Sequence, residues 1–248
     1  MLRLTKGVAL LHFGRAGSTL IATMIAHNKL FYFDGEIYES VRTGALKIPE
    51  NIQKSPEKLL IQRRKKFFYR DYLVSLKPIP EENLRPSLLN MSYSNFLKAL
   101  NDANINKCII IKRKNYLRQV LSNKLASKWN KWHFKKNEDS TKTKININCN
   151  SFQFSTFKGE LVELFNRFDN YYKEMENETK NPLIISYEDD IEKDSYIAYD
   201  KIRSYLNLRI KKPEIILSKS NTFKNEDVIE NYDEVIKHLK GTPYEWML

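Results

Sequence analysis

Residues 14–19, Gly-Arg-Ala-Gly-Ser-Thr, have the residue types of a loop that binds an anion. An apolar run, 8–13, precedes them, and apolar side chains at helical spacing follow over 20–25. This pattern predicts a strand, a tight loop and a helix, because glycine permits positive φ angles. The unpaired N–H groups and the dipole of a first helical turn favour an anion. The loop is therefore a candidate phosphate cradle, and the alternative is a plain glycine turn between strand and helix.

The loop is not a Walker A motif, which requires Gly-Lys-Ser/Thr after four intervening residues. Here Arg15 precedes the second glycine, Gly17, and no lysine follows it. A P-loop kinase would also need ligands for Mg²⁺, and the sequence contains no visible metal-binding cluster. The kinase is therefore the less favoured alternative.

A segment with carboxylates, 30–39, follows the candidate cradle at a distance of one helix. It is aromatic and acidic, and Asp34-Gly35 predicts a turn within it. A carboxylate from Glu36 or Glu39 would lie beside a group bound at the cradle, where it could accept the proton of an acceptor hydroxyl. The alternative is a solvated loop carboxylate.

A second candidate anion site follows the apolar run 107–112, which is typical of a central parallel strand buried on both faces. Arg113 comes at the end of this run, and Ser122 lies nine residues later on a predicted helix. Arginine suits this place because its guanidinium fits a phosphate with two hydrogen bonds. An ordinary basic strand end is the alternative.

These motifs together resemble those of sulfotransferases that use 3′-phosphoadenosine 5′-phosphosulfate (PAPS), in particular bacterial and carbohydrate-type members. The family's loop has a Lys or Arg, a small residue, Gly and two Ser/Thr, and its second motif is a basic strand end followed by a helical serine. The resemblance implies an enzyme that transfers a sulfuryl group from PAPS to a hydroxyl or amine of a carbohydrate, lipid or small molecule. It requires no metal.

The resemblance also implies roles for individual residues. The 5′-phosphosulfate would contact Arg15, Ala16, Gly17, Ser18 and Thr19, and Arg15 would also stabilise the charge of the leaving phosphate. Arg113 and Ser122 would hold the 3′-phosphate, with Arg118 as an alternative to Arg113.

The resemblance further implies that Glu36 is the general base, with Glu39 in reserve, and that Lys77 at the end of a predicted strand faces the site. Tyr187 would border the adenine, and Lys240 and Gly241 would contact a nucleotide phosphate, although stopping a helix is sufficient reason for Gly241.

Strands alternate with helices along the chain, which predicts an α/β fold with a mostly parallel central sheet and helices on both faces. The resemblance narrows this to a P-loop-NTPase-like sulfotransferase fold. We expect one domain over 1–248, with a loop or lid at about 128–155 near the acceptor site. In that segment Trp129 and Trp132 either stack on a sugar or pack inside. None of the histidines is a clear counterpart of the histidine that cytosolic small-molecule sulfotransferases use as a base, and His12 is expected to be packed in its strand.

The composition sets limits on the class of protein. The 248 residues carry a formal net charge of +12, which favours anionic partners. No run approaches the roughly 20 apolar residues of a membrane span, and two cysteines, Cys108 and Cys149, do not make a disulfide framework. We therefore expect a cytoplasmic protein without a membrane span or a nucleic-acid partner. A non-catalytic basic module that binds an anionic glycan or nucleic acid remains the alternative.

Overall fold

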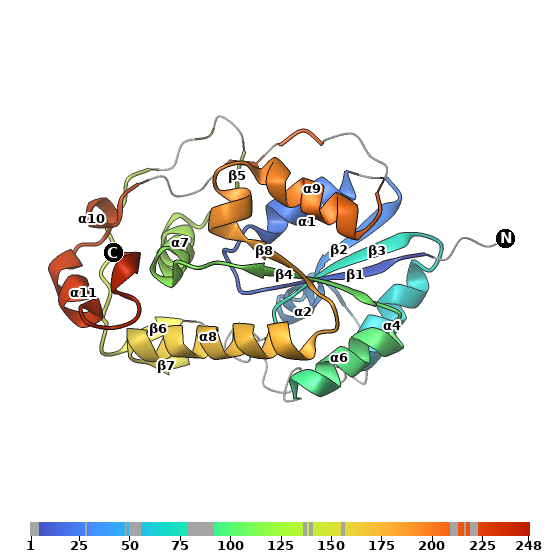
Figure 1. Ribbon diagram of the computed structural model, residues 1–248, viewed down its shortest axis with the longest axis horizontal. Coiled ribbons are helices and arrows are strands. Elements are labelled where there is room, and N and C mark those ends of the chain that lie inside the picture. The colour runs from blue at the N-terminus through green and yellow to red at the C-terminus, as the bar shows by residue number, and fades with distance from the viewer. Residues whose placement is uncertain are drawn as a thin grey trace.

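The computed structural model describes residues 5–27, 29–47, 49, 56–78, 92–135, 138, 141–154, 157–208, 213–215, 217–218 and 223–248. Its centre is a five-stranded sheet in the order β2-β3-β1-β4-β8, and every pairing in it is parallel (Figure 1). The strands are β1 (Gly7–His12), β2 (Phe31–Glu36), β3 (Asp71–Leu76), β4 (Lys107–Lys112) and β8 (Leu183–Ser186). The predicted α/β class with a parallel sheet is confirmed.

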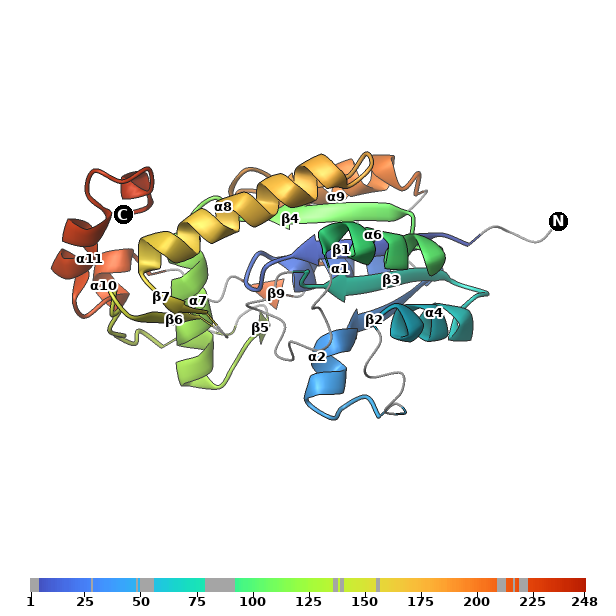
Figure 2. The same cartoon turned by 90° about the horizontal axis from the view of Figure 1, so that it is seen from below.

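Helices cover both faces of this sheet (Figures 1 and 2). One face packs against α1 (Ser18–Ala26) and α9 (Ser195–Tyr205). The other face packs against α4 (Pro56–Lys66), α6 (Tyr93–Asp102) and α8 (Leu161–Glu178). Two further helices, α2 (Ile37–Arg42) and α7 (Tyr116–Trp129), extend from the carboxyl-end side of the sheet. Among the described residues, no helix is long and apolar enough to cross a membrane.

The central strand β1 is buried along its whole length, which explains why it has no polar alternation. Its side chains point alternately to the two faces. Val8 and Leu10 pack with α1 and α9, while Ala9 and Leu11 pack with the helices of the opposite face. Both halves of the core therefore meet at β1, and the loop that follows β1 starts from the most constrained strand of the fold.

Three local predictions are wrong in detail. The apolar run within 182–189 predicts a buried strand, but β8 is an edge strand in which Ile184 is 41% exposed, and a π-helix over Tyr187–Ile191 follows it. The apolar spacing from Phe157 to Met175 predicts one helix, but the helix begins at Leu161, because Phe157 belongs to β7 (Phe157–Gly159), which pairs with β6 (Phe152–Phe154). The turn at Asp34-Gly35 lies inside β2, where the pairing with β3 is irregular and Gly35 has a φ of 69°.

The segment 128–155, as far as it is described, is attached to the C-terminal part of the chain. Ile145 forms a bridge with Ile229, and β5 (Phe134–Lys135) pairs with β9 (Leu217–Ser218). The chain then continues through α10 (Asn225–Val228), α11 (Tyr232–Leu239) and a 3-10 turn over Glu245–Met247. Segments far apart in sequence thus lie together on the carboxyl-end side of the sheet (Figure 1).

The connections after β1 and β4 leave the sheet in opposite directions. From β1 the chain passes through α1 to β2 on one side, and from β4 it passes through α7 and α8 to β8 on the other. The two strands are neighbours, with His12 paired to Ile111. Ligands of open parallel sheets bind outside the carboxyl ends of strands at such a reversal of strand order. The fold therefore points to the space beside residues 13–17 and 113.

Candidate functional site

A cavity of about 750 Å³ opens at the carboxyl ends of the strands. Candidate residues from several parts of the chain line it together: Arg15, Gly17, Ser18, Thr19, Glu36, Glu39, Lys77, Arg113, Ser122 and Tyr187. Each of the five sheet strands is followed, at or just beyond its end, by at least one of them. The structure therefore brings together residues that the sequence alone could only connect by motif.

The loop 14–17 holds a backbone conformation that exposes the N-terminus of α1. Arg15 and Gly17 both have positive φ angles, 66° and 85°. Gly17 is the N-cap of α1, and no side chain caps that helix. The first turn contains no acidic residue, so its N–H groups and dipole are not offset by a carboxylate of their own helix. This geometry is suited to an anion bound from the cavity.

The Arg15 guanidinium lies between α7 and the segment that follows it. Its Nε donates to the Ser122 hydroxyl at 3.0 Å and its Nη1 donates to the Trp132 carbonyl at 2.6 Å. Burial and the nearby charge of Arg113 lower the pKa of Arg15 to about 10, so the group stays cationic at neutral pH. Arg15 is thus a desolvated cation that already contacts a second candidate ligand, Ser122.

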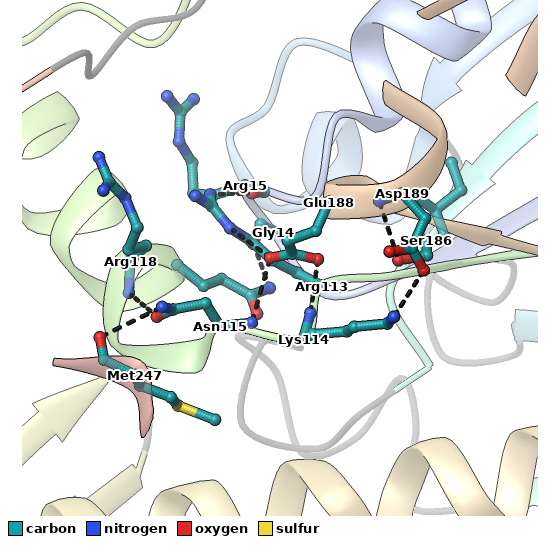
Figure 3. Close-up of polar contacts among 12 residues, drawn as sticks. Gly14, Arg15, Arg113, Lys114, Asn115, Arg118, Ser186, Glu188, Asp189 and Met247 are labelled. Atoms are coloured by element: carbon teal, nitrogen blue, oxygen red, sulfur yellow. Dashed lines mark hydrogen bonds and ion pairs between the residues drawn. The ribbon is translucent and has the colours of Figure 1, made fainter. Parts of the chain in front are cut away.

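Arg113 is only 5% exposed and is held from several sides (Figure 3). Its Nη1 donates to the Arg15 carbonyl at 3.0 Å, and its guanidinium stacks over the Tyr187 ring at 4.4 Å. Its buried Nε has no hydrogen-bond partner in the described structure, and the nearest carboxylate oxygen, on Glu188, is 3.8 Å away. Burial lowers the pKa of Arg113. The Nε is thus ion-paired with Glu188 but makes no hydrogen bond among the described residues, which leaves it able to donate to a bound anion.

Glu188 joins the ends of β4 and β8 (Figure 3). Its carboxylate accepts from the backbone N–H groups of Lys114 at 2.8 Å and Asn115 at 3.1 Å. Asn115 in turn caps α7 by accepting from the Arg118 N–H at 2.9 Å. The Arg118 guanidinium donates to the Phe223 carbonyl instead of lining the cavity. Between the two candidate arginines, the geometry therefore favours Arg113.

Glu36 and Lys77 form an ion pair of 2.8 Å at the ends of β2 and β3. Burial by itself would raise the pKa of Glu36, but the charge and hydrogen bond of Lys77 lower it below its usual value. Glu36 is therefore ionised at neutral pH and able to accept a proton. Glu39 also lines the cavity.

His12 lies beneath this ion pair, fully buried at the end of β1. One ring nitrogen, Nδ1, is 2.9 Å from the Phe13 carbonyl, and the other, Nε2, is 2.7 Å from the Ser75 hydroxyl. A carbonyl only accepts, so Nδ1 carries the proton and Nε2 accepts from Ser75. Burial lowers the pKa of His12 to about 4. His12 is a packed, neutral histidine, as its position in the strand predicted.

Three of the residues that the resemblance assigned to the nucleotide lie outside the lining of this cavity. Ala16 is fully buried and packs in the core beneath the loop. Lys240 and Gly241 follow α11, where the Gly241 N–H donates to the Glu245 carboxylate at 2.8 Å. Gly241 has a φ of 74°, which accounts for glycine at this helix end.

The sequence reading missed part of the lining. His133, which was not proposed as a site residue, lines the cavity, where burial and the charge of Arg15 lower its pKa while Glu36 opposes this shift. Its place directly after α7, in the segment already expected near the acceptor, was the available signal. Trp132, which was expected either to stack on a sugar or to pack inside, also lines the cavity. The sequence did not single out the further lining residues, which come from α7, the π-helix after β8, the start of α9, short strands and connecting segments: Asn123, Phe134, Phe154, Ile191, Glu192, Ser195, Ile215 and Leu217.

Comparisons of the chain with models of protein families, with curated proteins and with solved structures found no match. The described side chains also contain no group of three or more His, Cys, Asp or Glu residues placed to hold a metal ion.

Replacing Gly17 by alanine tests the conformation of the cradle. A Cβ at Gly17 would lie 3.0 Å from Ile191 Cδ1 and 3.2 Å from Tyr187 Cδ2, at a φ of 85°. Gly44, with a φ of 76° and nothing within 4 Å of its Cβ, is the matched control. Gly44→Ala should lose about 1–2 kcal/mol from backbone strain alone, and Gly17→Ala about 1 kcal/mol more from overpacking. Chemical denaturation measures both, and equal losses would contradict the close packing of this loop.

The buried His12 predicts a loss of stability in acid. Between pH 6.5 and about 4 the unfolded chain protonates this histidine and the folded chain does not. The free energy of unfolding should therefore fall by up to about 3 kcal/mol as the pH decreases through this window. In His12→Gln this part of the pH dependence should vanish, whereas exposed His27→Gln should keep it. Chemical denaturation at several pH values measures this dependence. If the free energy of unfolding of His12→Gln falls with pH as steeply as that of the unmodified protein, His12 is not the neutral buried group.

Proposed function

We propose that this chain is a sulfotransferase with a P-loop-NTPase-like fold, which transfers a sulfuryl group from PAPS to a hydroxyl or amine. One observation carries the proposal: the order of the candidate residues along the sheet edge. From β8 to β2 the strands end beside Tyr187, Arg113, the loop 14–19, Lys77 and Glu36 in turn. The groups of the donor follow one another in the same order: adenine beside Tyr187, the 3′-phosphate beside Arg113 and the 5′-phosphosulfate at the loop 14–19. The acceptor and its proton would lie next, beside Lys77 and Glu36.

The residues present fit the two anionic ends of such a donor. The uncapped N-terminus of α1 suits the 5′-phosphosulfate, and the Arg113 Nε, which makes no hydrogen bond among the described residues, suits the 3′-phosphate. The Ser122 hydroxyl accepts from Arg15, so its own proton is available to a phosphate oxygen. Tyr187, whose ring stacks with Arg113, would border the base.

The bound donor supplies a sulfuryl group whose bond to a 5′-phosphate oxygen breaks as the acceptor oxygen or nitrogen bonds to sulfur. Arg15, cationic and largely desolvated, is placed to stabilise the negative charge left on the phosphate. Glu36 is placed to take the acceptor proton, and its ion pair with Lys77 keeps the carboxylate ionised between turnovers.

Arg113→Ala tests the nucleotide assignment, with Arg118→Ala as its matched control. Loss of charged hydrogen bonds to the 3′-phosphate should weaken calorimetric binding of adenosine 3′,5′-bisphosphate by about ten- to hundredfold. Binding of adenosine 5′-monophosphate should change little, and Arg118→Ala should leave both ligands unaffected. Equal binding of adenosine 3′,5′-bisphosphate, ATP and adenosine 5′-monophosphate to the unmodified protein would contradict the proposal. Such equal binding would favour a general polyanion-binding module. ATP binding that depends on magnesium would favour a kinase.

Glu36→Gln tests the general base independently of binding. The amide cannot take a proton, so sulfuryl transfer from radiolabelled PAPS to a panel of alcohols, phenols and sugars should fall by about 10²–10⁴. Affinity for adenosine 3′,5′-bisphosphate should stay within a few-fold. Glu39→Gln, from the same cavity wall, is the control and should retain turnover. Turnover retained in Glu36→Gln and lost in Glu39→Gln would transfer the role to Glu39.

A further inference from the structure

The turn between α4 and β3 exposes two aromatic side chains at the opposite edge of the sheet from the cavity. Phe68 is 70% exposed and Tyr69 is 64% exposed. Their rings meet edge to face, with centroids 5.7 Å apart and planes at 87°. Single exposed apolar residues are ordinary, but an adjacent aromatic pair on a turn suggests a surface that is covered in use.

The turn is held in place by a buried guanidinium. Arg64, 7% exposed, donates to the Phe67 carbonyl at 3.1 Å, to the Arg70 carbonyl at 3.3 Å and to the Thr5 hydroxyl at 2.7 Å. The Thr5 hydroxyl donates in turn to the Phe68 carbonyl at 3.0 Å. Burying a charge is costly, and here the charge fixes the backbone of the turn. The aromatic pair is thus presented by an ordered structure.

A second loop extends this surface. Arg70 Nη2 donates to the Lys29 carbonyl at 2.6 Å, and the Asp71 N–H donates to the Leu30 carbonyl at 3.1 Å. Leu30 is itself 49% exposed. Residues 29–30 and 65–70 therefore form one surface at the amino ends of β2 and β3, which we call the amino-edge patch.

The amino-edge patch is basic as well as apolar. Its residues include Lys29, Lys65, Lys66 and Arg70 and no carboxylate. The three lysines are exposed, and the adjacent Asp71 is 1% exposed and accepts from the Lys6 N–H at 2.8 Å. The surface therefore combines unneutralised positive charge with apolar rings at the tip of a turn.

We propose that the amino-edge patch docks the protein on an anionic lipid surface. Aromatic side chains favour the interface between headgroups and acyl chains, and nearby lysines are attracted to anionic headgroups. A single-stranded nucleic acid would stack successive bases on ring faces along a groove, whereas these two rings are perpendicular and stand at the tip of a turn beside the apolar Leu30. The cavity lies at the carboxyl edge, so the docked protein keeps it open to water. The inference is independent of the reaction proposed for that cavity.

Co-sedimentation of the full chain with vesicles tests this surface. The protein should bind vesicles of phosphatidylcholine mixed with phosphatidylserine, bind pure phosphatidylcholine weakly, and dissociate as salt is raised. Lys65→Gln with Lys66→Gln should weaken binding by more than about tenfold. Phe68→Ser with Tyr69→Ser should weaken it to a similar degree through lost apolar burial. All four side chains are exposed, so these variants should fold normally.

Matched controls sit at the other end of the molecule. Lys158→Gln with Lys237→Gln removes the same charge from exposed sites on β7 and α11, and Trp246→Ser removes an aromatic ring that is 60% exposed. Both should retain vesicle binding. Equal losses in the controls, equal binding to neutral vesicles or no vesicle binding would overturn the proposal. Binding of single-stranded RNA that needs Phe68 and Tyr69, without vesicle binding, would instead assign the patch to nucleic acid.

Discussion

Two arginines whose charges influence each other, the buried Arg113 and the partly buried Arg15, are the constraint on which the site depends. The Arg113 Nη1 donates to the backbone carbonyl of Arg15, and the charge of Arg113 lowers the pKa of Arg15. Glu188, the carboxylate nearest to Arg113, already accepts from two backbone N–H groups. Like charges in a desolvated place raise the free energy of the folded protein. An anion bound between the arginines and the N-terminus of α1 would relieve that cost, so the fold and the proposed ligand are energetically linked.

The parallel sheet makes this arrangement possible. Neighbouring parallel strands end at the same edge, so residues separated by a hundred positions in the chain emerge beside one another. Gln119 connects α7 with the loop after β1, because its side-chain amide donates to the Gly14 carbonyl at 2.7 Å. On the other side of β1, the Glu36–Lys77 ion pair connects the carboxyl ends of β2 and β3. The opposite edge carries the amino-edge patch, so the two proposed functions occupy separate ends of the same strands.

Strong local patterns were readable from the sequence alone. The strands β1 and β4 and the glycine loop between β1 and α1 were predicted correctly, because burial on two faces and backbone geometry leave clear signatures. The edge position of β8 could not be predicted, because an edge strand and a central strand can have the same apolar run. His133 was not singled out, although its segment was expected near the acceptor, because no motif distinguishes it from the other residues of that segment. The convergence of Arg113, Ser122 and Tyr187 was expected from motifs, whereas only the folded structure shows that the Arg113 Nε makes no hydrogen bond among the described residues.

A crystal structure of the protein with adenosine 3′,5′-bisphosphate would test the central claim most directly. The account predicts the 5′-phosphate at the backbone N–H groups of 17–19 and the 3′-phosphate within hydrogen-bond distance of Arg113 Nε and the Ser122 hydroxyl. The adenine should lie against Tyr187. A ligand bound outside this cavity, or one whose 3′-phosphate contacts neither Arg113 nor Ser122, would contradict the account.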